Sequence, residues 1–151
     1  MNHPEPASFR VWTDLEVRFR DCDPMGHVNN AVFATYMEVG RQTYWRQFIK
    51  PQDITSVPFI VGRIEIDYRS PAFVGETLRV SMRTGWIGRH SFGTEYEIRE
   101  KETGRLVVEA KSVEVTYDYR TGAVIPVPDE LRTHLETIEG REIPTREQPG
   151  Q

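Results

Sequence analysis

Asp21 and Asp23 lie two residues apart in a short segment, DCDPMGHVNN, that also contains a histidine and two asparagines. Paired carboxylates could bind a metal ion, but His27 and Asn29 do not complete a recognisable set of ligands, so we expect no metal site. Asp is also a common turn residue that accepts backbone hydrogen bonds, and the residues alone favour that role for both carboxylates. The chemical alternative for Asp23 is attack on an acyl group, either as a nucleophile or as a general base that activates water.

A long amphipathic helix is predicted directly after this segment. Asn29 or Asn30 offers an N-cap, and apolar or small residues then follow at i, i+3, i+4, i+7, i+11 and i+15. These residues are Phe33, Tyr36, Met37, Gly40, Tyr44 and Phe48. At 1.5 Å per residue the helix would be about 28 Å long. The free N–H groups and the positive dipole end at its start could polarise an acyl oxygen beside Asp23.

An alternating strand is predicted before the carboxylates. Leu15, Val17 and Phe19 alternate with charged residues, which is the pattern of a strand with one buried face. Pro24 and Gly26 end the strand, because Pro has no N–H donor and Gly adopts backbone angles that other residues avoid. The two carboxylates therefore lie at a junction between a strand and a helix.

Four more alternating segments follow the helix, and each is expected to turn one face toward it. They are residues 64–69, 78–83, 92–99 and 106–117. In the last segment the apolar positions change phase, which predicts a β-bulge near Lys111 or Ser112. A short helix is predicted from Pro128. This order of elements indicates an α+β fold rather than repeated βαβ units.

Composition indicates one compact domain over residues 1–138, followed by a polar, proline-containing tail at 139–151 that we expect to be mobile. The net charge of −4 argues against binding to nucleic acid. The chain has no apolar run of about 18 residues, so we expect no membrane span. The first residues lack the pattern of a secretory leader and Cys22 is the only cysteine, so the predicted location is cytoplasmic.

The stretch RDCDPMGHVNNAVFATYMEVGR resembles the 4-hydroxybenzoyl-CoA thioesterase-like family of hotdog-fold acyl-CoA thioesterases. The resemblance covers residues 12–136 and continues through IEIDYRSPAFVGETLRV, IGRHSF and VEVTYDYRTGAVIPVPDELR. It implies a long central helix wrapped by a five-stranded antiparallel sheet, with active sites at a dimer interface. It also implies hydrolysis of an acyl-CoA thioester to a carboxylic acid and free CoA, with no separate cofactor. Because unpaired sheet edges favour association, we expect a homodimer or homotetramer.

In this family the second Asp of the D-x-D-P-x-G turn is the catalytic carboxylate, which corresponds here to Asp23. With the resemblance in view, catalysis becomes the favoured role of this residue. Backbone N–H groups near Asn30 would stabilise the charge that develops on the thioester oxygen. Gly26, His27 and Asn29 are the predicted substrate contacts in the turn. Asn29 is first a candidate helix cap, and His27 first a hydrogen-bonding loop residue.

Two further groups of candidates lie outside the turn. Glu38 is the rival of Asp23, because another branch of hotdog thioesterases uses a helix carboxylate; alternatively it pairs with Arg41 or lines the acyl tunnel. Arg89, His90 and Ser91 follow a glycine at a predicted turn, where the ordinary interpretation is a solvated loop. The family often places basic and hydroxyl groups there against CoA phosphates, so these three residues are predicted substrate contacts.

Two other functions remain open at this stage. A hotdog hydratase or dehydratase would need a catalytic histidine with an acid partner, for which His27 and Asp23 are the available pair. A non-catalytic acyl-CoA-binding module would keep the fold and the pocket without turnover.

Overall fold

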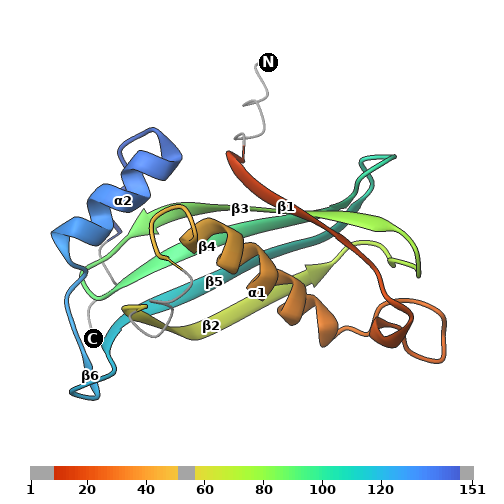
Figure 1. The fold of residues 1–151 in the computed structure, drawn as a ribbon, viewed down its shortest axis with the longest axis horizontal. Helices are drawn as coiled ribbons and strands as arrows, with labels where there is room; N and C mark the ends of the chain where they lie inside the picture. Colours follow the sequence, from red (N-terminus) through yellow and green to blue (C-terminus); the bar gives the residue numbers. More distant parts are fainter. Residues whose placement is uncertain (1–8, 51–56, 147–151) are drawn as a thin grey trace.

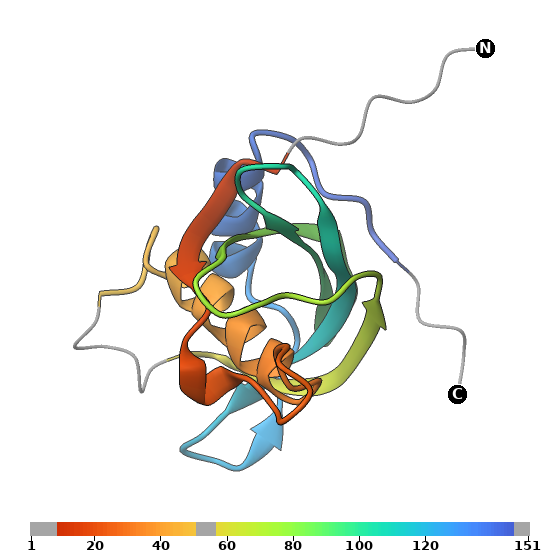
Figure 2. The same cartoon turned by 90° about the vertical axis from the view of Figure 1, so that its right-hand side faces the viewer.

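A curved antiparallel sheet wraps around one long helix in the computed structural model, which describes residues 9–50 and 57–146 (Figure 1, Figure 2). The sheet order is β1-β3-β4-β5-β2, and a short strand, β6, pairs with β5. The elements are β1 (Val11–Glu16), η1 (Phe19–Asp21), α1 (Val32–Trp45), β2 (Phe59–Tyr68), β3 (Thr77–Ile87), β4 (Ser91–Glu100), β5 (Leu106–Asp118), β6 (Ala123–Val124) and α2 (Asp129–Glu139). The predicted α+β class and the long helix against an antiparallel sheet are confirmed.

The predicted apolar face of α1 is buried against the sheet, with Phe33, Tyr36, Met37, Gly40 and Tyr44 all in the core. A Cβ atom on Gly40 would lie 2.8 Å from Cγ1 of Val80 in β3, so glycine allows the close approach of helix and strand. The helix is shorter than predicted, because it ends at Trp45 and not at Phe48. The following residues form a turn in which the Phe48 N–H donates to the Trp45 carbonyl.

The predicted strand Leu15–Phe19 is wrong in its bounds, because β1 ends at Glu16. Phe19 lies in the single-turn helix η1 and is 86% exposed, although the alternation predicted that it is buried. The chain leaves the strand here because the carboxylate of Asp21 accepts the backbone N–H of Arg18 at 3.1 Å. This local bond closes a turn before the strand can continue.

The predicted bulge near Lys111 or Ser112 is also wrong. In the pairing of β5 with β4, the register shifts at Val107 of β5. In the pairing of β5 with β2, the register shifts at Gly62 of β2. The second half of β5 therefore keeps its alternation and turns polar residues inward, so that Ser112, Glu114 and Thr116 are buried. The hydroxyls of Ser112 and Thr94 donate to the two carboxylate oxygens of Glu114, and hydrogen bonding replaces apolar packing in this region.

The short helix predicted from Pro128 is confirmed as α2, in which Leu131 and Leu135 are buried. Its last residue, Glu139, accepts the hydroxyl of Tyr44 at 2.7 Å. Residues beyond α2 run along β3, where the N–H of Ile87 donates to the carbonyl of Pro144 at 3.0 Å. The described part of the predicted tail is thus attached to the sheet, and residues 147–151 lie outside the described residues.

Within the described parts of the chain, neither helix has the length and apolar character needed to cross a membrane.

Candidate active site

Asp21 organises the junction between β1 and α1. Its carboxylate accepts two bonds from the guanidinium of Arg18, at 3.2 and 2.9 Å, and one from the hydroxyl of Tyr36 at 2.8 Å. Burial by itself would raise the pKa of Asp21, but the hydrogen bonds from Arg18 and Tyr36 together hold this pKa below its usual value. Asp21 is 4% exposed. Its side chain therefore fixes the loop, in agreement with the structural role that the sequence favoured for this residue.

Asp23 begins a tight turn that leaves part of its carboxylate available. Its backbone N–H donates to the carbonyl of His27 at 3.0 Å, and its carbonyl accepts the N–H of Gly26 at 3.0 Å. One carboxylate oxygen, Oδ1, accepts the N–H of Met25 at 2.9 Å. The other, Oδ2, lies 3.9 Å from Nδ1 of His27. The turn thus holds the carboxylate through Oδ1, while no hydrogen bond to Oδ2 occurs among the described residues.

The neighbouring turn residues have distinct positions. Gly26 has a φ of +89°, which only glycine adopts without strain, and it is exposed. Nδ1 of the His27 ring lies 3.3 Å from the carbonyl oxygen of Val28 and 3.9 Å from Oδ2 of Asp23. Gly26 and His27 therefore belong to the same turn as Asp23, and their role as substrate contacts stays a prediction.

Neither Asn29 nor Asn30 is the N-cap residue of α1; that position is Ala31, which has no side-chain cap. Oδ1 of Asn29 accepts the N–H of Ala31 at 2.9 Å, one residue before the helix. The carbonyl of Asn30 accepts the hydroxyl of Tyr68 at 3.0 Å. The N–H of Asn30 has no hydrogen-bond partner among the described residues, so it can donate to an incoming oxygen.

A second loop, between β2 and β3, supports the turn. The carbonyl of Ala72 accepts the N–H of Val28 at 2.9 Å, and Phe73 pairs with His27 in an antiparallel bridge. The sequence alone did not connect this loop with the site. The cluster SPAFVGE indicated a turn, but nothing in it indicated which segment the turn would contact.

Glu38 lies elsewhere on α1, two turns from its start. It is exposed and lines a cavity of about 250 Å³ together with Arg41, Trp45 and Phe59. The predicted pair between Glu38 and Arg41 does not form, because Arg41 donates instead to the hydroxyl of Tyr96 at 3.3 Å. The position of Glu38 beside a partly apolar cavity fits the alternative that it lines an acyl pocket.

Arg89, His90 and Ser91 lie at the opposite end of the molecule from the Asp23 turn. The turn between β3 and β4 is next to α2, whereas the segment before α1 lies beyond the far end of the sheet (Figure 1). Arg89 is exposed, but the side chain of Ser91 is 1% exposed. A single chain therefore does not bring these three residues to Asp23.

Metal-ligating side chains are not gathered in the parts of the chain that the structure describes: no three of His, Cys, Asp or Glu come close enough to hold an ion.

A carboxylate turn followed by a long helix, with a curved antiparallel sheet around that helix, is the arrangement expected of a thioesterase with the hotdog fold. The sequence of residues 17–135 matches the model of the thioesterase-like superfamily, and the chain belongs to this superfamily.

Individual relatives agree with this assignment. The crystal structure of a thioesterase from Thermus thermophilus, complexed with coenzyme A and Zn, has a TM-score of 0.80 and 38% identity, over 88% of this chain and 96% of that one. The long-chain acyl-CoA thioesterase FadM of Escherichia coli (strain K12) is 28% identical over 128 residues, which are 83% of this chain and 97% of that protein. A 1,4-dihydroxy-2-naphthoyl-CoA hydrolase of Nostoc punctiforme is 29% identical over 129 residues, which are 80% and 83% of the two chains. The predicted hotdog family and fold are thus confirmed.

Proposed function

We propose that this protein is an acyl-CoA thioesterase in which Asp23 is the catalytic carboxylate. The superfamily assignment and the named relatives support thioester hydrolysis. The observation that favours Asp23 is its geometry: Oδ1 is held by the turn, Oδ2 is left without a hydrogen bond among the described residues, and the unpaired N–H of Asn30 lies at the start of α1.

In the proposed reaction, the thioester carbonyl oxygen accepts a hydrogen bond from the N–H of Asn30. Asp23 either attacks the carbonyl carbon to form an anhydride, which water then hydrolyses, or takes a proton from the water that attacks. Both routes break the carbon–sulfur bond, and the thiolate of CoA leaves and takes up a proton. The N–H donor stabilises the oxyanion; removal of one such donor from an enzyme costs about 3 to 4 kcal/mol in the barrier.

The proposal includes a second copy of the chain. Met25 in the turn is 79% exposed and Phe73 beside it is 44% exposed, while Ile64 and Tyr68 on the edge strand β2 are 38% and 48% exposed. An apolar edge of this kind favours pairing with another chain. A homodimer or homotetramer would cover these residues and supply the missing wall of an acyl pocket. Arg89 and His90 would then approach CoA from the partner, whereas Ser91 is buried within its own chain and does not serve as the predicted contact. A cytoplasmic location remains part of the same prediction.

The test is incubation of the purified protein with short, medium, long and aromatic acyl-CoA thioesters while free thiol is measured. Release of thiol that depends on Asp23 supports the proposal. The 3.9 Å approach of His27 to Asp23 is the observation behind the second candidate, a hydratase. Loss of an enoyl-CoA double bond without thiol release would support the hydratase, and binding without either reaction would support the non-catalytic module.

A further inference from the structure

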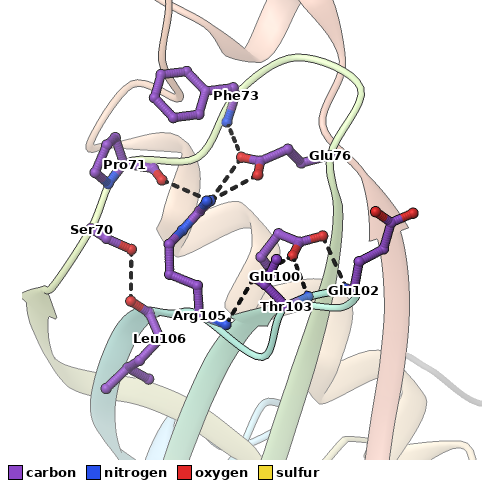
Figure 3. Close-up of polar contacts among 9 residues, drawn as sticks. All are labelled: Ser70, Pro71, Phe73, Glu76, Glu100, Glu102, Thr103, Arg105 and Leu106. Carbon is purple, nitrogen blue, oxygen red and sulfur yellow. Dashed lines mark hydrogen bonds and ion pairs between the residues drawn. The ribbon is translucent and has the colours of Figure 1, made fainter.

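Arg105, in the turn between β4 and β5, holds the loop between β2 and β3 in a fixed shape (Figure 3). Its Nη2 donates to the carbonyl oxygen of Pro71 at 3.1 Å and to the two carboxylate oxygens of Glu76 at 2.9 and 2.8 Å. The same carboxylate accepts the backbone N–H of Phe73 at 2.7 Å. Both ends of the segment 71–76 are therefore tied to one guanidinium group.

The backbone at Arg105 is itself fixed by the turn that precedes it. Oε2 of Glu100 accepts the backbone N–H and the hydroxyl of Thr103, at 2.8 and 2.6 Å. The hydroxyl oxygen of Thr103 in turn accepts the N–H of Arg105 at 3.2 Å. Figure 3 shows these bonds below and to the right of the guanidinium group. Arg105 is thus attached to the rigid end of two long strands, and it extends from there to a loop.

The loop transmits this restraint to the catalytic turn. The carbonyl of Ala72 accepts the N–H of Val28, and Phe73 pairs with His27. The carbonyl of His27 accepts the N–H of Asp23. A continuous set of hydrogen bonds therefore leads from the β4–β5 turn to the backbone of the catalytic carboxylate.

We propose that Arg105 is a positioning residue for this reaction. Through Glu76 and the segment 71–76, it holds the Asp23 turn in the orientation in which the carboxylate reaches the thioester. The inference rests on the proposed function and assigns a role to a pair of residues outside the turn. Because displacement of a reacting group by about 1 Å can cost as much as 100-fold in rate, a support of this kind affects turnover without touching substrate.

The chemistry of arginine suits this position. Its guanidinium group binds the Glu76 carboxylate and the Pro71 carbonyl at once through Nη2, whereas the ammonium of lysine is a point charge on a flexible stem. Nε of Arg105 is buried and has no hydrogen-bond partner among the described residues. An unpaired buried donor lowers stability, and proteins keep local costs of this kind mainly where function requires the geometry.

A second arginine provides a matched control. Arg79 forms two hydrogen bonds with the carboxylate of Asp14, at 2.8 and 3.1 Å, between β3 and β1. Its side chain is 39% exposed and that of Arg105 is 36% exposed. The bonds of Arg79 do not involve the segment 71–76, so Arg79→Gln removes a comparable ion pair without changing the support of the turn.

The experiment measures kcat and KM for the most active acyl-CoA substrate with wild type, Arg105→Gln, Arg105→Lys, Glu76→Gln and Arg79→Gln. We expect kcat to fall about ten-fold in Arg105→Gln and in Glu76→Gln, with KM changed less than about two-fold, because the support acts on the reacting group. Arg105→Lys should recover only part of kcat. Arg79→Gln should keep the wild-type kcat. Amide hydrogen exchange at residues 23–28 should be faster in Arg105→Gln than in Arg79→Gln.

The same Arg105 substitution is then placed in an Asp23→Asn background. A residue that acts through Asp23 has no further effect on residual turnover once that carboxylate is gone, so we expect the double variant to equal Asp23→Asn. A purely structural role for Arg105 would reduce turnover in both backgrounds by the same factor.

Three outcomes would overturn the positioning role: wild-type kcat in folded Arg105→Gln and Glu76→Gln, an equal loss in Arg79→Gln, or full additivity with Asp23→Asn. If Arg105→Gln does not fold, Arg105→Lys and Glu76→Gln decide the question by the same criteria. Failure of the proposed function is recognised separately, because wild type would then release no thiol or Asp23→Asn would remain fully active.

Discussion

The hydroxyl of Tyr36, in α1, donates a hydrogen bond of 2.8 Å to Oδ2 of Asp21 and so joins the central helix to the turn that holds Asp23. Burial, and then the bond to Asp21, raise the pKa of Tyr36 far above its usual value. The phenol therefore stays protonated and remains a donor at neutral pH. The Asp23 turn is thus attached to the helix on one side and to the β2–β3 loop on the other.

Removal of this hydroxyl should weaken both the fold and the site. We expect Tyr36→Phe to lower the free energy of unfolding by about 2 kcal/mol, because a buried carboxylate loses one of its donors. Turnover should also fall, since Asp21 fixes the start of the turn. Denaturant titration and thiol release measure the two effects. The control is Tyr119→Phe, which should keep full turnover. It removes a hydroxyl that donates to the carbonyl of Phe59, at the start of β2 and away from the Asp23 turn.

Isosteric substitutions distinguish the two candidate catalytic carboxylates, Asp23 and Glu38. We expect Asp23→Asn to fold normally and to lose about 100-fold or more in kcat, because the amide is neither a nucleophile nor a base. Glu38→Gln should keep kcat within a few-fold, since Glu38 is exposed on α1 away from the turn. Near wild-type turnover in Asp23→Asn, together with a large loss in Glu38→Gln, would transfer the catalytic role to the helix.

Glu114 should give the fold a specific dependence on pH. Burial raises the pKa of this carboxyl, despite hydrogen bonds from Ser112 and Thr94. In the interval between the unfolded pKa of about 4.3 and the raised folded pKa, the native state binds more protons than the unfolded state. The contribution of Glu114 to stability is therefore greatest below this interval and decreases as the pH rises through it.

The matching experiment is denaturant unfolding of wild type and Glu114→Gln from pH 4 to pH 8. We expect the substituted protein to lose this part of the pH dependence, because the amide does not titrate. Parallel stability curves for the two proteins over the whole range would show that Glu114 does not titrate as described.

Arg89 is tested by comparing two substrates. If it contacts CoA phosphates across a subunit boundary, Arg89→Ala should raise KM for intact acyl-CoA about ten-fold and leave a truncated pantetheine thioester unaffected, because only CoA has the nucleotide phosphates. The truncated thioester also controls for damage to the fold. Equal changes in KM with both substrates, or no change with either, would show that Arg89 is an ordinary solvated turn residue.

Assembly is tested at the edge strand β2. Ile64 is 38% and Tyr68 48% exposed in a single chain. We expect wild type to have at least a dimeric mass by light scattering. Ile64→Arg should shift the protein toward monomer with loss of thiol release, because the dimer would bury an unpaired charge at this apolar edge. A wild-type monomer with full activity at micromolar concentration would rule out a shared site.

The sequence by itself determined the features that depend on near neighbours. The spacing of Phe33, Tyr36, Met37 and Tyr44 predicted the buried face of α1, because residues three and four positions apart lie on the same face of a helix. The D-x-D-P-x-G segment likewise predicted a turn before the helix, since Pro and Gly act on the backbone at their own positions. The family resemblance depended on the same local motif.

Tertiary structure decided the features that depend on pairing between distant segments. The inward direction of Ser112 and Glu114 follows from the register of β5 against β4 and β2, and an alternating sequence does not record where a register shift falls. Arg105 and Glu76 are 29 residues apart, and their contact exists only because the β4–β5 turn and the β2–β3 loop meet at one end of the sheet. Local periodicity assigns a side chain to a face, but only the folded chain places that side chain beside a partner.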